Sequence, residues 1–450
     1  MLLSPSILPS PSPPPPLVST VCHRLGTLAL LLAILSAGAV GVQAQDTIRL
    51  MQYNLMYYTN SSGISDCNST TNNLDNKDAN IKTIFQYVKP TVMCVCEMGS
   101  QTQYADRLLD NAINTDGIDY YLRGPLTNQS GGSIANMIYY DSRKLTLYKS
   151  TNITTSYRDI NGYTFFYNAD NLAGGDTIFT TFWIAHLKAG TGYTNESARL
   201  TQAQKLMNRI SSSGLPGNYT FSGDFNVYSS DEPAYQELTE YSNSLYRFYD
   251  PVNSPGYWHS NAQFASLHTQ STHSQYTDCF SSGGLDDRFD IILVSPYIYY
   301  GSDRIHIIEG SYHALGQDGM RFNGTVLSPA NTSVPNDVAV ALYQQSDHLP
   351  VIMDMAVDAH VGVQEHLAGP FVRIVNPVRE TLQVELQHDG AGRYAISLFS
   401  MDGRALATYY EDLEEGVHRL SYPFPYGKGA YLVHVQRENG PKTVKKVICF

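Results

Sequence analysis

Short apolar runs separated by polar loops predict a strand-rich domain between residue 47 and about residue 358. Helical spacing interrupts this pattern twice. One helix places Ile81 and Val88 on the same face, and a second runs from about Glu196 to Ile210. Strands are predicted at Thr47–Tyr53, Thr91–Cys96, Ala135–Tyr140, Lys144–Lys149, Thr177–Ala185, Tyr219–Ser222, Asp290–Val294 and Val351–Met355.

The pattern changes near residues 361–370, after which short alternating strands are separated by glycine-containing turns. Strands such as Leu382–Leu386, Tyr394–Ser400 and Ala430–Gln436 predict a small β-sandwich without a catalytic cluster. We therefore expect a catalytic domain over residues 45–360, a linker over 361–369 and a β-sandwich domain over 370–450.

The first 44 residues are not expected to belong to the fold. The apolar run Leu25–Val42 is followed by small residues suited to signal-peptidase cleavage before Gln45, which predicts a signal peptide over 1–44. An uncleaved N-terminal membrane anchor is the alternative interpretation. Either way we expect an exported protein, and no later segment predicts a stable membrane span.

Composition suits an extracellular, strand-rich protein, with 33 tyrosines and 16% charged residues. The formal net charge of −12 argues against tight, non-specific binding of a nucleic-acid duplex through a large basic face. Local lysines and arginines can still line a cleft. Cys94 and Cys96 are expected to be buried thiols, whereas Cys67 and Cys279 lie in polar loops and could pair, which the sequence does not decide.

Polar side chains recur where the predicted strands begin or end. Two of them, Asp224 and Asn226, are two residues apart in an extended segment and therefore point to the same side. Carboxylate and amide oxygens are the ligands that Mg²⁺ prefers, and a carboxylate beside an imidazole holds it in one tautomer. The following set therefore outlines a metal-assisted phosphodiester hydrolase: Asn54, Glu97, Asp224, Asn226, Asp290, Asp347 and His348.

With these residues in place, the chain resembles the endonuclease/exonuclease/phosphatase superfamily over nearly all of residues 47–358. The resemblance implies an α+β fold, a four-layer αββα sandwich with the site at one edge of its sheets. The matching strings occur in the family's order and are Tyr53-Asn54, Cys96-Glu97, Ala185-His186-Leu187, Gly223-Asp224-Phe225-Asn226, Arg288-Phe289-Asp290-Ile291-Ile292 and Ser346-Asp347-His348-Leu349-Pro350.

The resemblance also implies a metal site. Glu97 would be the main Mg²⁺ ligand, assisted by Asn54 and Asp347, and Mn²⁺ or Ca²⁺ could take the place of Mg²⁺. The chain departs from the family at Tyr53, where Trp is frequent, and at Cys96, where Gln is commoner. Both departures are neighbours of ligands, so they leave the expected metal site intact.

The remaining motif residues are expected to handle the water and the phosphate. By resemblance, Asp224 and Asn226 bind or orient the nucleophilic water and the phosphate. His348, held by Asp290, is the general base or a charge partner, and His186 contacts the scissile phosphate or acts as an acid. His348 and Asp224 both remain candidates for the group that deprotonates the water.

Further cations and histidines have two interpretations each. Lys188 and Arg199 follow the His186 motif and are expected to contact the phosphate backbone of a substrate, with solvated helix charges as the alternative. His259, His268 and His273 lie in a Ser/Thr-rich segment and are expected to be surface residues rather than substrate contacts. The long segments 253–284 and 302–337 are typical of functional rims or lids.

The C-terminal region carries a resemblance of its own, to the sorting domain of the bacterial type IX secretion system. It rests on Asn376-Pro377-Val378, Gly429-Ala430-Tyr431-Leu432-Val433 and the basic stretch Lys442–Lys446. This resemblance implies a bacterial protein that is secreted or displayed on the cell surface, with the secretion machinery as a partner. A substrate-binding β-sandwich is the alternative.

Together these expectations describe an exported, Mg²⁺-dependent phosphodiesterase, with an endonuclease acting on extracellular DNA or RNA as the favoured interpretation. A phosphatase or a sphingomyelinase-like phospholipase of the same mechanism is the first alternative. A non-catalytic surface adhesin built on this fold is the second.

Overall fold

The computed structural model describes residues 46–60, 67–169, 177–213, 216–358, 371–374, 378–388, 391–401, 403–438, 440 and 442–449. The predicted signal peptide 1–44, the linker 361–369 and Asn376-Pro377 lie outside these residues. Within the described part of the chain, no helix is both long enough and apolar enough to cross a membrane.

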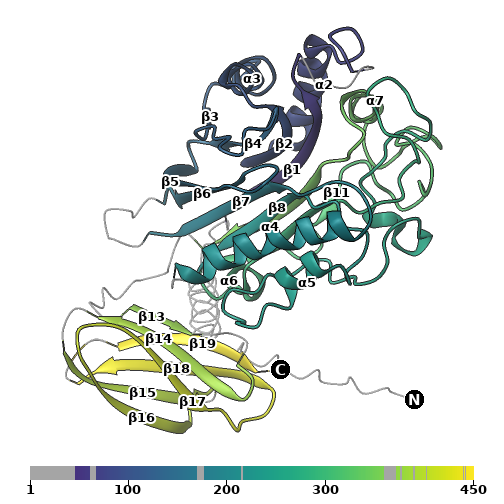
Figure 1. The fold of residues 1–450 in the computed structure, drawn as a ribbon. Coiled ribbons are helices and arrows are strands. Elements are labelled where there is room, and N and C mark those ends of the chain that lie inside the picture. Colours follow the sequence, from purple (N-terminus) through teal and green to yellow (C-terminus); the bar gives the residue numbers. More distant parts are fainter. Residues whose placement is uncertain are drawn as a thin grey trace, which may run out of the picture. The chain divides into compact units, whose positions relative to one another are not determined.

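Two β-sheets form the centre of residues 46–358 (Figure 1). The first has the strand order β10-β12-β1-β2-β4-β3, with β11 also paired to β12, and the second has the order β5-β6-β7-β8-β9. The strands of the first sheet are β1 (Asp46–Tyr58), β2 (Val92–Gly99), β3 (Tyr121–Arg123), β4 (Ile134–Asp141), β10 (Ile305–Ile307), β11 (His313–Ala314) and β12 (Val351–Val357). Those of the second are β5 (Leu145–Ile153), β6 (Ile160–Tyr167), β7 (Phe179–His186), β8 (Tyr219–Asp224) and β9 (Asp290–Val294).

Helices cover the outer faces of both sheets, as three separate apolar clusters show. The inner cluster joins residues of the two sheets, such as Leu50 of β1 and Ile184 of β7. The outer clusters join the first sheet to α2, α3 and α7, and the second sheet to α4 and α5. The predicted four-layer αββα architecture is therefore confirmed. The helices are α2 (Leu74–Val88), α3 (Thr102–Leu108), the π-helix η1 (Leu109–Ile113), α4 (Tyr193–Ser212), α5 (Pro233–Thr239), the 3-10 helix η3 (Ala262–Leu267), α6 (Pro296–Tyr300) and α7 (Asn336–Gln345).

The sequence pattern of α2 explains its position. Ile81 and Val88 are buried on one face, and the Asn73 side chain caps the N-terminus by accepting a hydrogen bond from Asn76 N at 3.0 Å. The pattern of α4 is less regular, because Arg199 is fully buried beside its apolar face whereas Leu200 is only partly buried.

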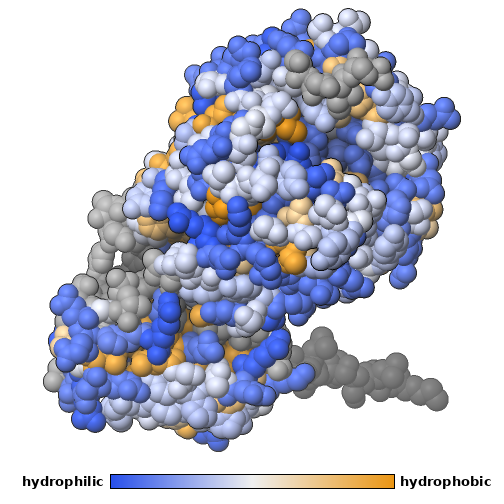
Figure 2. Space-filling model, in the orientation of Figure 1, coloured by the Kyte–Doolittle hydropathy of each residue, from blue (hydrophilic) through white to orange (hydrophobic). Residues whose placement is uncertain are grey.

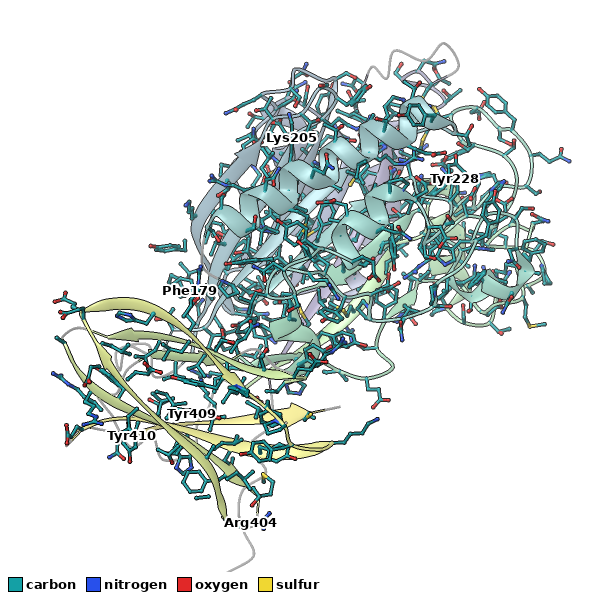
Figure 3. The ribbon with its side chains drawn as sticks, turned by 60° about the horizontal axis from the view of Figure 1, so that its bottom comes forward. Phe179, Lys205, Tyr228, Arg404, Tyr409 and Tyr410 are labelled. Carbon is teal, nitrogen blue, oxygen red and sulfur yellow. A yellow bond between two sulfur atoms is a disulfide. The ribbon has the colours of Figure 1, made fainter. Side chains whose placement is uncertain are left out.

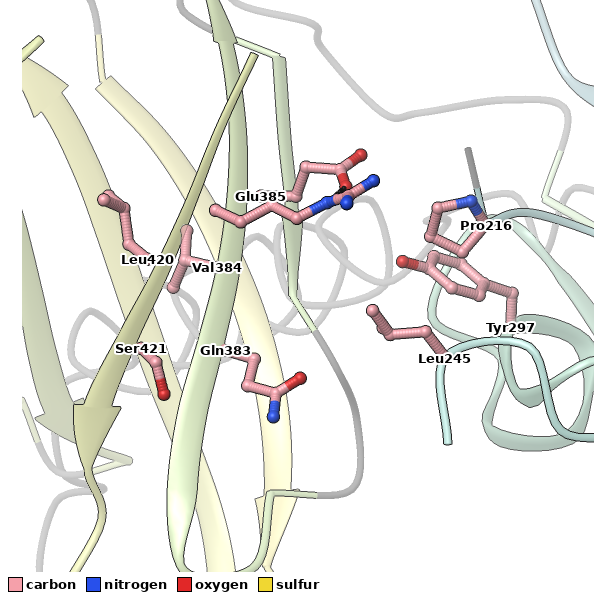
Figure 4. A pocket seen from close by; sticks show the side chains of 9 residues that line it. Pro216, Leu245, Tyr297, Gln383, Val384, Glu385, Leu420 and Ser421 are labelled. Atoms are coloured by element: carbon pink, nitrogen blue, oxygen red, sulfur yellow. Dashed lines mark hydrogen bonds and ion pairs between the residues drawn. The ribbon is translucent and has the colours of Figure 1, made fainter. Parts of the chain in front are cut away.

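Residues 371–449 form the expected C-terminal β-sandwich. Its sheets have the orders β13-β14-β17 and β16-β15-β18-β19 around one apolar core. Tyr409 of β16 (Figure 3) stacks on Tyr422 at a centroid distance of 4.1 Å. Glu385 of β14 (Figure 4) pairs with Arg419 of β17. The strands are β13 (Phe371–Ile374), β14 (Thr381–His388), β15 (Gly392–Ser400), β16 (Ala405–Leu413), β17 (Gly416–Pro423), β18 (Gly429–Arg437) and β19 (Lys442–Cys449).

One disulfide joins distant segments of the catalytic domain. Cys67, between β1 and α2, bonds to Cys279 in the long segment between η3 and β9. The pairing that the sequence left open is therefore present, and Cys94 and Cys96 are buried free thiols as predicted. The visible face of the molecule is mostly hydrophilic, with hydrophobic residues scattered over it (Figure 2).

Candidate active site

The ends of neighbouring strands bring the motif residues of the second sheet together. His186 ends β7 and lies opposite Asp224, which ends β8, and Asp224 in turn lies opposite Asp290, the first residue of β9. In the first sheet, Asn54 of β1 lies opposite Cys96 of β2, next to Glu97. Side chains from separate parts of the chain therefore meet at one edge of the two packed sheets.

A glycine makes the approach of β7 and β8 possible. A Cβ atom placed on Gly223 would lie 1.7 Å from Ala185 O, far inside van der Waals contact. Only glycine fits at this point, where the parallel pairing of the strands sets His186 beside Asp224. The glycine of the Gly223-Asp224-Phe225-Asn226 motif thus has a steric role in building the site.

Glu97 reaches the site from a bulge. The pairing of β2 with β4 shifts in register around Glu97, whose φ is +56°. The pairing of β1 with β2 shifts in the same way around Met56 and Tyr57, whose φ angles are +49° and +50°. Bulges of this kind redirect side chains and are common beside active sites. The bulge in β1 turns Tyr57 N toward Glu97 Oε2, to which it donates a hydrogen bond at 3.1 Å.

Asn54 connects two carboxylates. Its Nδ2 donates to Glu97 Oε1 at 3.1 Å and to Asp224 Oδ2 at 3.0 Å, while its Oδ1 accepts from Met56 N at 2.9 Å. The contact with Met56 N fixes the amide so that its nitrogen faces the site. That Asn54 ligates the metal stays a prediction; in this structure its Oδ1 accepts from Met56 N and its Nδ2 orients the two carboxylates.

His348 and Asp290 form a buried pair. His348 Nδ1 lies 2.6 Å from Asp290 Oδ2, and Nε2 faces Asp224 Oδ2 at 3.8 Å and Asp347 Oδ1 at 4.0 Å. The predicted contact between Asp290 and the imidazole of His348 is therefore present. It fixes the orientation of the ring, with Nε2 toward the other site residues.

Asn226 and Lys188 flank these groups. Asn226 N donates to Asp224 Oδ1 at 3.0 Å, and its Nδ2 lies 3.4 Å from Leu187 O. Lys188, half-buried, directs Nζ to Ala189 O at 2.7 Å. Asn226 therefore fixes the Asp224 carboxylate, and Lys188 adds positive charge close to His186.

Burial and crowding of like charges change the acidities in the site. Burial, with help from Asp290 and Glu97, raises the pKa of Asp224 to about 7. Burial and the nearby Asp347 also raise the pKa of Glu97. Carboxylates held this close repel one another, so a bound cation would stabilise their ionised forms.

The pKa values of the two imidazoles of the site are shifted in opposite directions. Burial, together with the positive charges of Arg158, His348 and Lys188, lowers the pKa of His186 well below its usual value. Burial also disfavours a charged His348, but the carboxylates around it, led by Asp290, outweigh burial and raise its pKa well above the usual value. His186 is therefore the neutral ring of the pair.

The donor set fits a divalent cation. One ligand atom from each of Glu97, His186 and Asp224 can be chosen so that all three lie within 4.8 Å of one another. His186 Nδ1 is buried, has no hydrogen-bond partner among the described residues and lies 3.7 Å from Glu97 Oε1. The carboxylate oxygens of this set suit Mg²⁺ or Mn²⁺. This set differs from the predicted ligands in including His186 and Asp224.

Two residues that sequence reasoning missed contact the site. Arg158, in the turn between β5 and β6, donates from Nε to His186 O at 2.9 Å and from Nη2 to Leu187 O at 2.7 Å. Gln270 contacts both Asp347 and His348 through Nε2. Neither residue lies in a recognisable motif, and each reaches the site only through a loop, so no signal in the sequence could have found them.

Other predictions about charged residues need correction. Arg199 is 0% exposed and donates to Glu232 Oε2 at 2.9 and 2.7 Å, so it is a buried structural ion pair rather than a substrate contact. His268 and His273, expected at the surface, are 0% and 2% exposed. His268 is held by the backbone oxygens of Trp258 and Leu285, whereas His259 is partly exposed and bonds to Asp287.

Comparison with known proteins found no matching family model and no matching curated protein. Solved structures do match. An endonuclease/exonuclease/phosphatase from Beutenbergia cavernae DSM 12333 is 13% identical, with 89% of this chain and 99% of that chain covered and a TM-score of 0.41. The human Nocturnin catalytic domain with bound sulfate anion is 15% identical, with 70% and 97% covered and a TM-score of 0.42.

A third match is D. rerio TDP2 complexed with single strand DNA product, at 13% identity, 69% and 99% coverage and a TM-score of 0.43.

Proposed function

We propose that the protein is a divalent-metal-dependent phosphodiester hydrolase, and specifically a nuclease acting on DNA or RNA. The observation that carries the proposal is the convergence of Glu97, Asp224 and Asp347 with two imidazoles at one sheet edge, where His348 pairs with Asp290 at 2.6 Å. Hydrolysis of a phosphodiester needs charge neutralisation at the phosphate, a base for the water and a group near the leaving oxygen, and this set provides all three.

Glu97 and Asp347, with Asp224 and His186 beside them, would hold Mg²⁺ or Mn²⁺. When bound, the cation would neutralise negative charge on the phosphate and help to stabilise the leaving oxygen. Asn54 keeps two of these carboxylates in place through its Nδ2.

A bound cation would offset the carboxylates that raise the pKa of His348, which favours the neutral ring. Neutral His348 then takes up the proton of the attacking water at Nε2, while Asp290 holds Nδ1–H. Asp224 orients the water, since Asn226 and Asn54 fix its two oxygens. His186, neutral and adjacent to Arg158, faces the phosphate. Asp224 is the other candidate for the proton acceptor, because its Oδ2 lies 3.8 Å from His348 Nε2, beside the same position.

Substrate choice and metal dependence can be tested together. Purified protein is incubated with plasmid DNA, single-stranded DNA, RNA and sphingomyelin, each with and without EDTA. We expect cleavage of a nucleic acid that EDTA abolishes and added Mg²⁺ restores. Cleavage of sphingomyelin alone would redirect the proposal to a phospholipase, and cleavage that is indifferent to EDTA would overturn it.

The pH profile of two variants separates the candidate bases. If His348 accepts the proton, Asp224→Asn keeps the acidic limb of the kcat profile and His348→Ala loses it. The opposite pattern would assign the proton to Asp224 and overturn the role given to His348.

We also propose that the protein is exported and that residues 370–450 direct its sorting, on the basis of the resemblance of the C-terminal sequence. Expression of a chain that ends at residue 369 in a bacterium with a type IX system tests this. Retention of the truncated, active enzyme in the periplasm supports sorting, whereas normal secretion would contradict it.

A further inference from the structure

Residues 270–284, here called the 270–284 loop, contact Asp347 and His348 of the site. Gln270 Nε2 lies 3.2 Å from Asp347 Oδ2 and 2.8 Å from His348 Nε2. At the other end of the loop, Ser281 N donates to the same Asp347 oxygen at 3.2 Å. One oxygen of Asp347 thus accepts two hydrogen bonds from this loop.

This arrangement assigns different roles to the two oxygens of Asp347. Oδ2 is held by the loop, whereas Oδ1 faces the site, 4.0 Å from His348 Nε2. A carboxylate that is fixed through one oxygen presents the other in a single direction, which is how surrounding hydrogen bonds orient metal ligands.

We propose that Gln270 is a positioning residue, which orients Asp347 as a metal ligand and His348 as a base. The inference rests on the proposed metal-dependent function. The amide nitrogen of Gln270 can donate one hydrogen to Asp347 and one to the lone pair of His348 Nε2. The second contact requires the tautomer in which His348 Nδ1–H donates to Asp290, the same tautomer that general-base chemistry needs.

The orientation of the Gln270 amide follows from its neighbours. A flipped amide would place its oxygen against the Asp347 carboxylate, where two acceptors would repel one another. Glutamate has the same shape but no N–H donor, so Gln270→Glu sets a charge against Asp347 with almost no change in volume. This substitution therefore tests hydrogen bonding and local charge rather than packing.

Backbone contacts hold the loop against the site. Thr272 N donates to Asp347 O at 3.0 Å, and Leu349 N donates to Thr269 O at 2.8 Å. The two ends of the loop are joined because Ser271 Oγ donates to the backbone oxygen of Ser281 at 2.7 Å. The loop and the Asp347 segment thus form one hydrogen-bonded unit.

The disulfide anchors the far end of this unit. Cys279 lies two residues before Ser281 and is bonded to Cys67, which follows the β1 strand that carries Asn54. By fixing Cys279, this bond keeps Ser281 N in place to donate to Asp347 Oδ2. The expected consequence is that metal affinity depends on an oxidised disulfide.

Metal affinity provides a test that does not depend on turnover. Binding of Mn²⁺ to the purified full chain is measured by electron paramagnetic resonance for the wild type, Gln270→Ala, Gln270→Glu and the exposed control Gln263→Glu. Loss of groups that orient metal ligands typically weakens binding roughly 10- to 100-fold. We expect a loss in this range for Gln270→Glu, a smaller loss for Gln270→Ala, and wild-type affinity and melting temperature for the control.

The variant Glu97→Gln, which lacks a proposed ligand, should bind Mn²⁺ more weakly than the wild type. If it does, but both Gln270 variants bind Mn²⁺ with wild-type affinity, the role of Gln270 is overturned and the proposed function stands. A wild-type protein that binds no Mn²⁺ would overturn both. For the disulfide, the double variant Cys67→Ser/Cys279→Ser is measured at a temperature where circular dichroism shows it folded. Weaker Mn²⁺ binding supports the anchoring role, and unchanged binding overturns it.

Discussion

The edge of the catalytic domain and the C-terminal sandwich bury different kinds of side chain. At the catalytic edge, Asn54, Asp224 and Asp290 are each at most 2% exposed. In the described part of the sandwich the core is apolar. The buried polar residue there is Glu385, which is 9% exposed and pairs with Arg419. Burying charged and amide groups costs free energy unless they are well paired.

This contrast in buried side chains identifies the region that carries chemistry. A sheet with one buried face is stabilised by alternating apolar and polar positions, as in the sandwich, and its folding does not require several buried carboxylates. The catalytic edge holds Glu97, Asp224 and Asp347 close together with positive φ at Glu97, which are costs that a purely structural role would not explain. Substitutions in the two regions should therefore act on different properties.

The largest effect is expected for His348→Ala. Removing a general base typically lowers the rate roughly 10²- to 10⁴-fold, so kcat should fall by this factor. The measurement is initial rate on the preferred nucleic acid at saturating Mg²⁺, with Arg419→Ala in the sandwich as the control that keeps wild-type kcat. A His348→Ala protein with more than a tenth of wild-type kcat would contradict the assigned role.

The next largest effect is expected for Gly223→Ala. The added Cβ would lie 1.7 Å from Ala185 O, so β7 and β8 must move apart. Overpacking of this kind costs about 1–3 kcal/mol or more, and the separation also displaces His186 from Asp224. Urea unfolding measures the loss, and Gly217→Ala, where no atom lies within 4 Å of the new Cβ, should leave stability nearly unchanged. Equal stabilities for the two variants would show that the strands adapt.

A pH-dependent effect is expected at Lys77 of α2, which lies behind the site. Its Nζ donates to the backbone oxygens of Leu55, Met56 and Gln345 at 3.0, 2.9 and 2.7 Å. Burial lowers the pKa of Lys77 to about 7. An unfolded lysine has a pKa of about 10.4, so between pH 7 and about 10 the unfolded chain binds more protons and stability contributed by this group rises with pH.

Lys77→Met should remove this contribution. The variant leaves three backbone oxygens without their shared donor, at a cost of about 1–3 kcal/mol, and should show a smaller rise in unfolding free energy between pH 7 and pH 9 than the wild type. The comparison is urea unfolding at both pH values, with the exposed Lys149→Met as control. Parallel pH dependence of the wild type and Lys77→Met would exclude a lowered pKa of Lys77.

The smallest effect is expected for Arg419→Ala. Arg419 Nε lies 3.1 Å from Glu385 Oε2, but the Arg419 side chain is 59% exposed. Exposed ion pairs contribute about 0–1 kcal/mol, so unfolding free energy should fall by less than about 1 kcal/mol. A loss of several kcal/mol in urea unfolding would show that the sandwich depends on buried polar pairing, and the contrast between the two regions would fail.

Much of the catalytic core was predictable because its strands are short apolar runs with a polar residue at one end. Strand β8, predicted at Tyr219–Ser222, extends two residues further to Asp224, and β9 begins at Asp290 as predicted. The strand β6, Ile160–Tyr167, was missed because its alternation includes Asn161 and Gly162, which read as a turn. The buried Arg199 was misread because a charge on a helix usually faces water.

Local patterns in the chain already place particular side chains at the ends of the strands, since apolar periodicity and the turn residues beside it are local properties. Three other contacts depend on the packed fold: Asn54 donates to two carboxylates, Arg158 borders His186, and Cys67 bonds to Cys279. These contacts join residues far apart in the chain through loops and bulges. Their geometry depends on how two sheets pack, which no local pattern encodes.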